Sequence, residues 1–128
     1  MSVFRRAGAL ALLVAGVIHL QQYFSLYSHV PTIGPLFLLN FAGAAAIALG
    51  LLVPVERLWP SLSLAGAAMA GTALVFLLIA EHATLFGWTE SGYYPTAIVL
   101  VLISEGLTVL LLSAFLLSTR PWAMWSRA

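Results

Sequence analysis

The chain has 128 residues, of which 62% are hydrophobic and 7% are charged, and its formal net charge is +1. A water-soluble domain of this size carries charge at about a quarter of its positions, so the composition excludes a soluble globular domain and indicates a protein embedded in lipid. The small net charge excludes a nucleic-acid-binding surface. The chain contains no cysteine, which excludes disulfides, thiolate metal sites and covalent haem attachment through cysteine.

Four stretches are long and apolar enough to cross a membrane as helices, which takes about 20 residues each. In chain order they are predicted at residues 7–27, 34–53, 62–86 and 95–117. Pro54 closes the second stretch, Gly87 closes the third, and the fourth ends before Pro121. The connections are short, so neighbouring helices should run antiparallel. The sequence therefore predicts an all-α integral membrane protein, a four-helix up-down bundle that forms one domain over residues 1–128.

Arginine placement predicts how the bundle is oriented. The basic residues are all arginines and lie before the first stretch, between the second and third, and after the fourth, at Arg5, Arg6, Arg57, Arg120 and Arg127. Cytoplasmic loops carry the excess of positive charge, so we expect both termini on the cytoplasmic side of the cell inner (plasma) membrane. Aromatic residues typical of membrane interfaces flank the stretches, at Trp59, Trp122 and Trp125 on the predicted inner side and at Tyr23, Tyr27, Trp88, Tyr93 and Tyr94 on the outer side.

A few polar residues interrupt the apolar stretches. Such residues are costly in lipid, so they are expected to face the bundle interior and to mark a candidate functional site. In the first stretch, helical spacing places them on a stripe with Gly8, Ala15 and Gly16, and small residues of this kind favour helix contacts in lipid. A helix rise of about 1.5 Å per residue puts the group in the outer half of the bundle. The predicted polar cluster consists of His19, Gln22, Tyr23, Asn40, Glu81, His82 and Glu105.

Three interpretations of this cluster are open from the sequence. In the first, the residues bond one another and hold the helices together, each bond contributing ~0.6–2 kcal/mol. In the second, they bind a cofactor or ligand. His19 and His82 would then hold a haem iron, or a metal ion together with Glu81 and Glu105. An isoprenoid quinone, bonded by a histidine and a tyrosine or glutamine, is another such ligand. In the third, the cluster is a proton or ion path.

Two segments, Gly16-Val-Ile-His19-Leu and Ile33-Gly34-Pro35-Leu-Phe-Leu-Leu-Asn40, resemble short four-helix membrane proteins of high-GC bacteria. The four-span size and the early Gly-x-x-His19 are similar to DoxX-like proteins, some of which are tied to membrane redox chemistry and quinones. This resemblance implies a redox role for His19.

The sequence favours a non-enzymatic membrane subunit or binding protein with a buried polar pocket in the outer half of the bundle. The alternative is a membrane redox or transport protein that uses the same residues for haem, a metal ion, a quinone or protons. The expected partners are the lipid bilayer and, because so small a bundle leaves much surface facing lipid, a second copy of the chain or another subunit of a membrane complex.

Overall fold

The computed structural model describes residues 2–84, 87 and 96–119, and these residues are almost entirely helical. Helix α1 (Ser2–Gln22) continues into the π-helical segment η1 (Tyr23–Tyr27), and the chain goes on through the elements α2 (Ile33–Leu52), η2 (Glu56–Leu58), α3 (Trp59–His82) and α4 (Thr96–Thr119). All four long helices of this described part are long and apolar enough to cross a membrane. The prediction of four membrane-crossing helices in an all-α chain agrees with this result.

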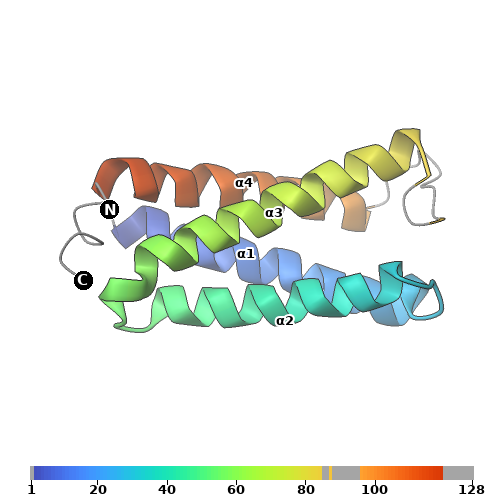
Figure 1. Ribbon diagram of the computed structural model, residues 1–128, viewed down its shortest axis with the longest axis horizontal. Helices are drawn as coiled ribbons and strands as arrows, with labels where there is room; N and C mark the ends of the chain where they lie inside the picture. Colours follow the sequence, from blue (N-terminus) through green and yellow to red (C-terminus); the bar gives the residue numbers. More distant parts are fainter. Residues whose placement is uncertain (1, 85–86, 88–95, 120–128) are drawn as a thin grey trace.

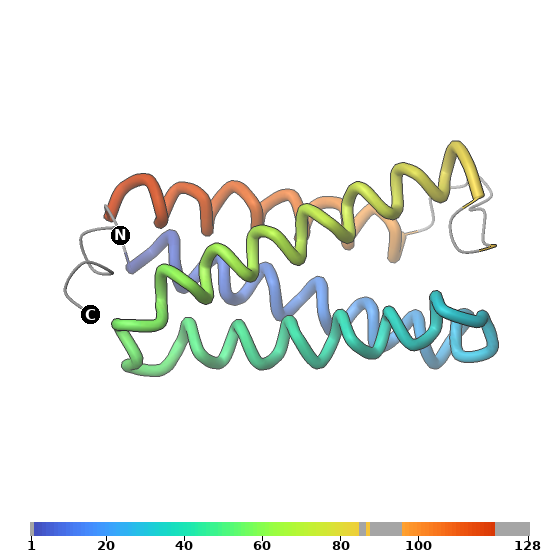
Figure 2. The backbone as a smooth tube through the Cα atoms, viewed as in Figure 1, coloured from blue at the N-terminus to red at the C-terminus, as the bar shows by residue number. Residues whose placement is uncertain are grey.

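The four helices lie side by side along the long axis of the molecule (Figure 1). The start of α1, the end of α4 and the connection between α2 and α3 lie at one end, which we call the Arg5 end. The connection between α1 and α2 lies at the opposite end, which we call the Tyr27 end. Helix α1 packs extensively against α2 and α4, whereas the contact between α2 and α3 is less extensive. Figure 2 shows the reason, because α3 runs obliquely and diverges from α2 towards the Tyr27 end.

The helix ends differ from the predicted bounds by one or two residues in α2 and α4 and by more in α1 and α3. Helix α1 begins at Ser2 rather than near residue 7, so Arg5 and Arg6 lie within its first turns instead of before it. Helix α3 extends over Trp59–His82 rather than residues 62–86. Hydropathy identifies only the residues that are suited to the hydrocarbon core of a membrane. The helix itself continues for as long as its backbone hydrogen bonds are made internally. Several predicted features lie outside the described residues, namely the end of the third stretch at Phe86, the connection at 88–94 with Trp88, Tyr93 and Tyr94, and the chain after Thr119 with Arg120, Trp122, Trp125 and Arg127.

Small residues bring the helix backbones close together, as predicted from the stripe on the first helix. Gly8, Ala15 and Gly16 are all buried. A Cβ atom added to Gly16 would lie 2.8 Å from the Cβ of Ala44 on α2, and one added to Gly8 would lie 2.5 Å from Cδ2 of Leu112 on α4. Because apolar surface alone gives helices no reason to associate in lipid, such close approach supplies the packing that holds them. The fully buried core cluster consists of Ala9, Ala48, Leu51 and Leu112.

A tight connection joins α1 to α2 at the Tyr27 end. The backbone N–H of Ile33 donates to the carbonyl oxygen of Pro31 over 2.7 Å, and Thr32 between them has a φ of 67°. This is a γ-turn with a positive central φ, a rare and strained conformation for a β-branched residue. A Cβ added to Gly34 would lie 2.5 Å from the carbonyl oxygen of Tyr27. The absence of a side chain at Gly34 therefore lets α2 begin directly against η1.

Candidate functional site

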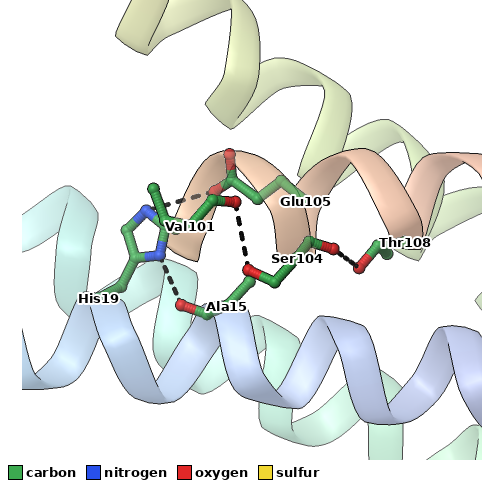
Figure 3. Close-up of polar contacts among 6 residues, drawn as sticks. All are labelled: Ala15, His19, Val101, Ser104, Glu105 and Thr108. Carbon is green, nitrogen blue, oxygen red and sulfur yellow. Dashed lines mark hydrogen bonds and ion pairs between the residues drawn. The ribbon is translucent and has the colours of Figure 1, made fainter. Parts of the chain in front are cut away.

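His19 on α1 and Glu105 on α4 meet in the interior of the bundle (Figure 3). Their Nε2 and Oε1 atoms are 3.5 Å apart, and the two side chains are 11% and 2% exposed. The other ring nitrogen of His19, Nδ1, lies 2.7 Å from the carbonyl oxygen of Ala15. A carbonyl oxygen only accepts hydrogen bonds, so Nδ1 carries a proton and Nε2 is the nitrogen that faces the carboxyl group.

The arrangement of the pair defines how many protons it holds. With Nδ1 protonated, the contact between Nε2 and Oε1 is favourable when the pair holds one further proton, because a bare nitrogen lone pair facing a carboxylate would be repulsive. The pair is then either imidazolium with carboxylate or imidazole with carboxylic acid, and both forms have a net charge of zero. A neutral pair is the state that burial among apolar helices favours.

The hydroxyl groups next to Glu105 are satisfied within α4. Ser104 Oγ donates to the carbonyl oxygen of Val101 over 3.2 Å, and Thr108 Oγ1 donates to the carbonyl oxygen of Ser104 over 2.7 Å. Both side chains are buried, yet their hydroxyls bond back to their own helix, as Ser and Thr commonly do in helix interiors. They therefore shape the wall around Glu105 without extending its polar contacts to other helices (Figure 3).

A cavity of about 440 Å³ adjoins the pair and is bounded by all four long helices. This volume is within the range of about 300–1,000 Å³ that is usual for ligand sites. Most of the wall is apolar, and polar side chains contribute to it at His19, Gln22, Tyr27, Asn40, Thr72 and Glu105. Leu39 on α2 and Thr72 on α3 line the cavity and are also exposed at the molecular surface. The cavity therefore opens between α2 and α3, where these two helices diverge.

Aromatic rings form one side of the cavity. The ring centroid of Phe37 lies 4.9 Å from that of His19, with the rings edge to face. It lies 4.5 Å from the ring centroid of Tyr27. Tyr27 follows His19 by eight residues, which in a regular α-helix would rotate it by about 80° around the helix. The wider turns of the π-helical segment η1 remove part of that rotation, so that Tyr27 is buried and lines the same cavity as His19.

Asn40 differs from the other polar residues of the wall. The hydroxyl of Thr72 donates to the carbonyl oxygen of Ala68 over 2.7 Å, and Nε2 of Gln22 donates to Oε1 of Gln21 over 2.6 Å. Asn40 is half-buried and lines the cavity, but its amide makes no hydrogen bond with any residue that the structure describes. The cavity wall thus carries an amide whose donors and acceptor are available to a bound molecule.

No family model, curated protein or solved structure matches the chain. The DoxX-like resemblance therefore stays a prediction. What the site can do has to be argued from its geometry.

The structure brings together part of the predicted polar cluster. The cavity wall includes His19, Gln22, Asn40 and Glu105. Tyr23 begins η1 and packs against Phe24, with their ring centroids 5.2 Å apart, and it is not part of the wall. Glu81 and His82 lie in the last turn of α3, where Glu81 is half-buried and His82 is exposed, and neither lines the cavity. The sequence-based depth of these two residues assumed a helix reaching residue 86, whereas α3 ends at His82.

The candidate metal ligands His19, His82 and Glu81 are not gathered at one place. Among the described residues, no group of three His, Asp or Glu side chains is arranged to hold a metal ion. Most residues of the wall were outside the predicted cluster, among them the aromatic residues Tyr27 and Phe37. In the sequence, Tyr27 resembles the aromatic residues that lie at a membrane interface. No local sequence pattern predicts the π-helical turn that directs its side chain inward.

Proposed function

We propose that the chain is an integral protein of the cell inner (plasma) membrane that binds a lipophilic ligand in the cavity between its four helices. The observation that carries this proposal is the cavity of about 440 Å³ with the His19–Glu105 pair and the Asn40 amide in its wall. A molecule with an apolar body and a hydrogen-bonding head would match both parts of that wall. Isoprenoid quinones belong to this class of ligand.

The proposed orientation is an up-down bundle with both termini in the cytoplasm. It is supported by Arg5 and Arg6 at the start of α1 and Arg57 between α2 and α3, since these connections lie at the same end of the molecule. Positive charge marks the cytoplasmic side. The cavity is lined by the Tyr27-end residues of α1, α2 and α3, so in this orientation it would occupy the outer half of the membrane.

A purely structural role accounts for less of the site. The His19–Glu105 pair joins α1 to α4, and that contact is sufficient to explain both side chains as interhelical links. It does not explain the space beside them, because helix interiors are normally packed without large voids. Nor does it explain an unsatisfied amide at Asn40, which within hydrocarbon is unfavourable until something bonds it.

The position of the opening supports supply of the ligand from the bilayer. Leu39 is 66% exposed, and it lies on the rim of the cavity with Thr72 on the facing helix. Both helices are long and apolar enough to be surrounded by lipid. A lipophilic molecule could therefore pass sideways from the bilayer into the cavity without crossing water.

Haem or metal binding by His19 is less well supported. Both ring nitrogens already have partners, Nδ1 at Ala15 and Nε2 at Glu105. Ligation through Nε2 would require the imidazole to leave the carboxyl group and uncover it in the bundle interior. The geometry therefore favours hydrogen bonding to a ligand over coordination of a metal.

The test fills the cavity from one wall and measures lipid binding. Ala73 lines the cavity, whereas Ala65 on the same helix is exposed and does not. The full chain in lipid nanodiscs would be incubated with a fatty alcohol bearing a photoactivatable diazirine, and labelled peptides would be counted by mass spectrometry. Ala73→Trp should reduce labelling of the cavity wall about tenfold, and Ala65→Trp should leave it unchanged. Equal labelling in both variants would show that the probe marks only the lipid-facing surface.

A further inference from the structure

The described polar residues of the cavity wall carry no net charge. His19 and Glu105 are the only acidic or basic side chains among the described residues that line it, and the single proton between them makes the pair neutral. The remaining polar side chains of the wall are amides and hydroxyls, at Gln22, Tyr27, Asn40 and Thr72. A charged head group would therefore find no counter-charge among the described residues of this wall to compensate its transfer from the membrane surface.

Asn40 indicates which hydrogen bonds the ligand must make. A side-chain amide presents an NH2 group with two donors and a carbonyl oxygen that accepts. In this structure neither part is used by another described residue. Burial of such a group is unfavourable without a partner, so a bound molecule that both donates to and accepts from the amide is favoured over one that can do only half.

The His19–Glu105 pair adds a second polar group to the same wall. Both ring nitrogens of His19 and the Oε1 atom of Glu105 have partners, so the atom of the pair that is left for a ligand is Oε2 of Glu105, which accepts a hydrogen bond. The pair lies between α1 and α4, whereas Asn40 lies on α2. A ligand head between them would be contacted from two sides while its apolar body remains against the rest of the wall.

We infer that the cavity selects an uncharged lipophilic molecule whose head group both donates and accepts hydrogen bonds, such as a long-chain alcohol or primary amide. This inference rests on the proposed function and narrows it to one chemical class of ligand. Asn40 is the residue that distinguishes this class from a plain hydrocarbon. The neutral His19–Glu105 pair is what disfavours carboxylates and ammonium groups of the same chain length.

The inference is tested by competition among molecules that share one hydrocarbon chain. Oleyl alcohol, oleamide, oleic acid, oleylamine and octadecene would each compete with the diazirine-bearing fatty alcohol for the full chain in nanodiscs at neutral pH. Oleyl alcohol and oleamide should compete at concentrations about tenfold lower than the acid, the amine or the hydrocarbon. Equal competition by all five, or preference for the acid or amine, would overturn the inference and leave a lipid-binding function standing. Absence of specific labelling by the probe would overturn both.

Variants at Asn40 test the residue assigned to recognition. Asn40→Leu keeps a side chain of similar size and removes its hydrogen bonding. Oleyl alcohol should therefore lose its advantage over octadecene and compete with the probe at about the same concentration. Leu38→Ala is the matched control, because Leu38 lies on the same helix outside the cavity wall and should keep the advantage. Asn40→Ala provides a second variant, and thermal unfolding in detergent establishes that each variant is folded. Retention of the full advantage in folded Asn40→Leu would show that Asn40 does not recognise the head group.

Discussion

The guanidinium group of Arg5 lies over the indole ring of Trp59, with Cζ 3.6 Å from the ring centroid. Arg5 is 3% exposed, and its Nη1 atom donates to the backbone carbonyl oxygen of Leu51. The indole Nε1 in turn donates to the carbonyl oxygen of Val53 over 3.1 Å. The Arg5 side chain thus joins the start of α1 to the carbonyl oxygen of Leu51, one of the last carbonyls of α2, which lack partners within their own helix, and to Trp59 at the start of α3.

This contact predicts a structural role for Arg5, in addition to any effect of its charge on the orientation of the chain in the membrane. Arg5→Leu should lower the free energy of unfolding by about 2–3 kcal/mol, because it removes a hydrogen bond from a charged donor and a cation–π contact. Arg6→Leu is the matched control, since Arg6 is exposed, and it should change stability by less than about 0.5 kcal/mol. Unfolding in mixed micelles measures both, and equal losses would show that the Arg5 contacts do not stabilise the fold.

Gly34 is the position where a single methyl group should disturb the site. In Gly34→Ala the new Cβ would lie 2.5 Å from the carbonyl oxygen of Tyr27, so α2 or η1 must move, at a cost of about 2 kcal/mol. Gly106→Ala is the control, because a Cβ there has no atom within 4 Å, and alanine in a helix should be neutral or stabilising by about 0.5–1 kcal/mol. Thermal unfolding of both variants in detergent gives the comparison. A Gly34→Ala protein as stable as Gly106→Ala would mean that the close contact is not maintained.

The strained γ-turn at Thr32 predicts a stabilising substitution. Thr32 has a φ of 67°, which is unfavourable for a β-branched residue and free of strain for glycine. Thr32→Gly should therefore raise the free energy of unfolding by about 1 kcal/mol after its larger entropy loss on folding is included. Ser28, with a φ of −57°, is the control, and Ser28→Gly should be destabilising. Loss of stability in Thr32→Gly would show that the turn is not strained.

Because His19 and Glu105 are in contact, the effects of substituting them on the free energy of unfolding should be strongly non-additive. His19→Leu or Glu105→Leu leaves the remaining polar side chain buried without its partner, which should destabilise the protein by about 3 kcal/mol. The double variant replaces the pair by two apolar side chains and should be less destabilised than either single variant, so the coupling should exceed about 3 kcal/mol. A double-mutant cycle of unfolding free energies measures the coupling. Simple addition of the two single effects would show that the side chains do not interact.

For Asn40, we expect one substitution to increase stability and to weaken ligand preference. Asn40→Leu removes an amide without a protein partner from an apolar wall, so it should raise the free energy of unfolding by about 1 kcal/mol while ligand preference is lost. Asn40→Gln is the comparison that keeps hydrogen-bonding capacity. Unfolding in detergent and lipid competition on the same preparations give both quantities. If Asn40→Leu were destabilised, the amide would have a structural partner instead of a ligand role.

The sequence predicted the candidate site in part. His19 and Glu105 were selected because each is an ionisable residue within an apolar stretch, and the structure places them in contact. Glu81 was selected by the same argument, but it lies in the last turn of α3 and does not line the cavity. The free-energy cost of burying a polar side chain implies that it has either a partner or an exposed position. That cost does not tell which of the two applies to a given residue.

The four helices follow from the sequence because length and hydropathy are local properties of a stretch, and each stretch satisfies its own backbone hydrogen bonds. The pairing of His19 with Glu105, the inward rotation of Tyr27 by the π-helical turn and the opening between α2 and α3 depend on contacts between distant parts of the chain. They are set by which small residues meet, as Gly16 does with Ala44 and Gly8 with Leu112. An apolar helix has many faces of similar hydropathy, so its rotation and tilt are defined only when it packs against its neighbours.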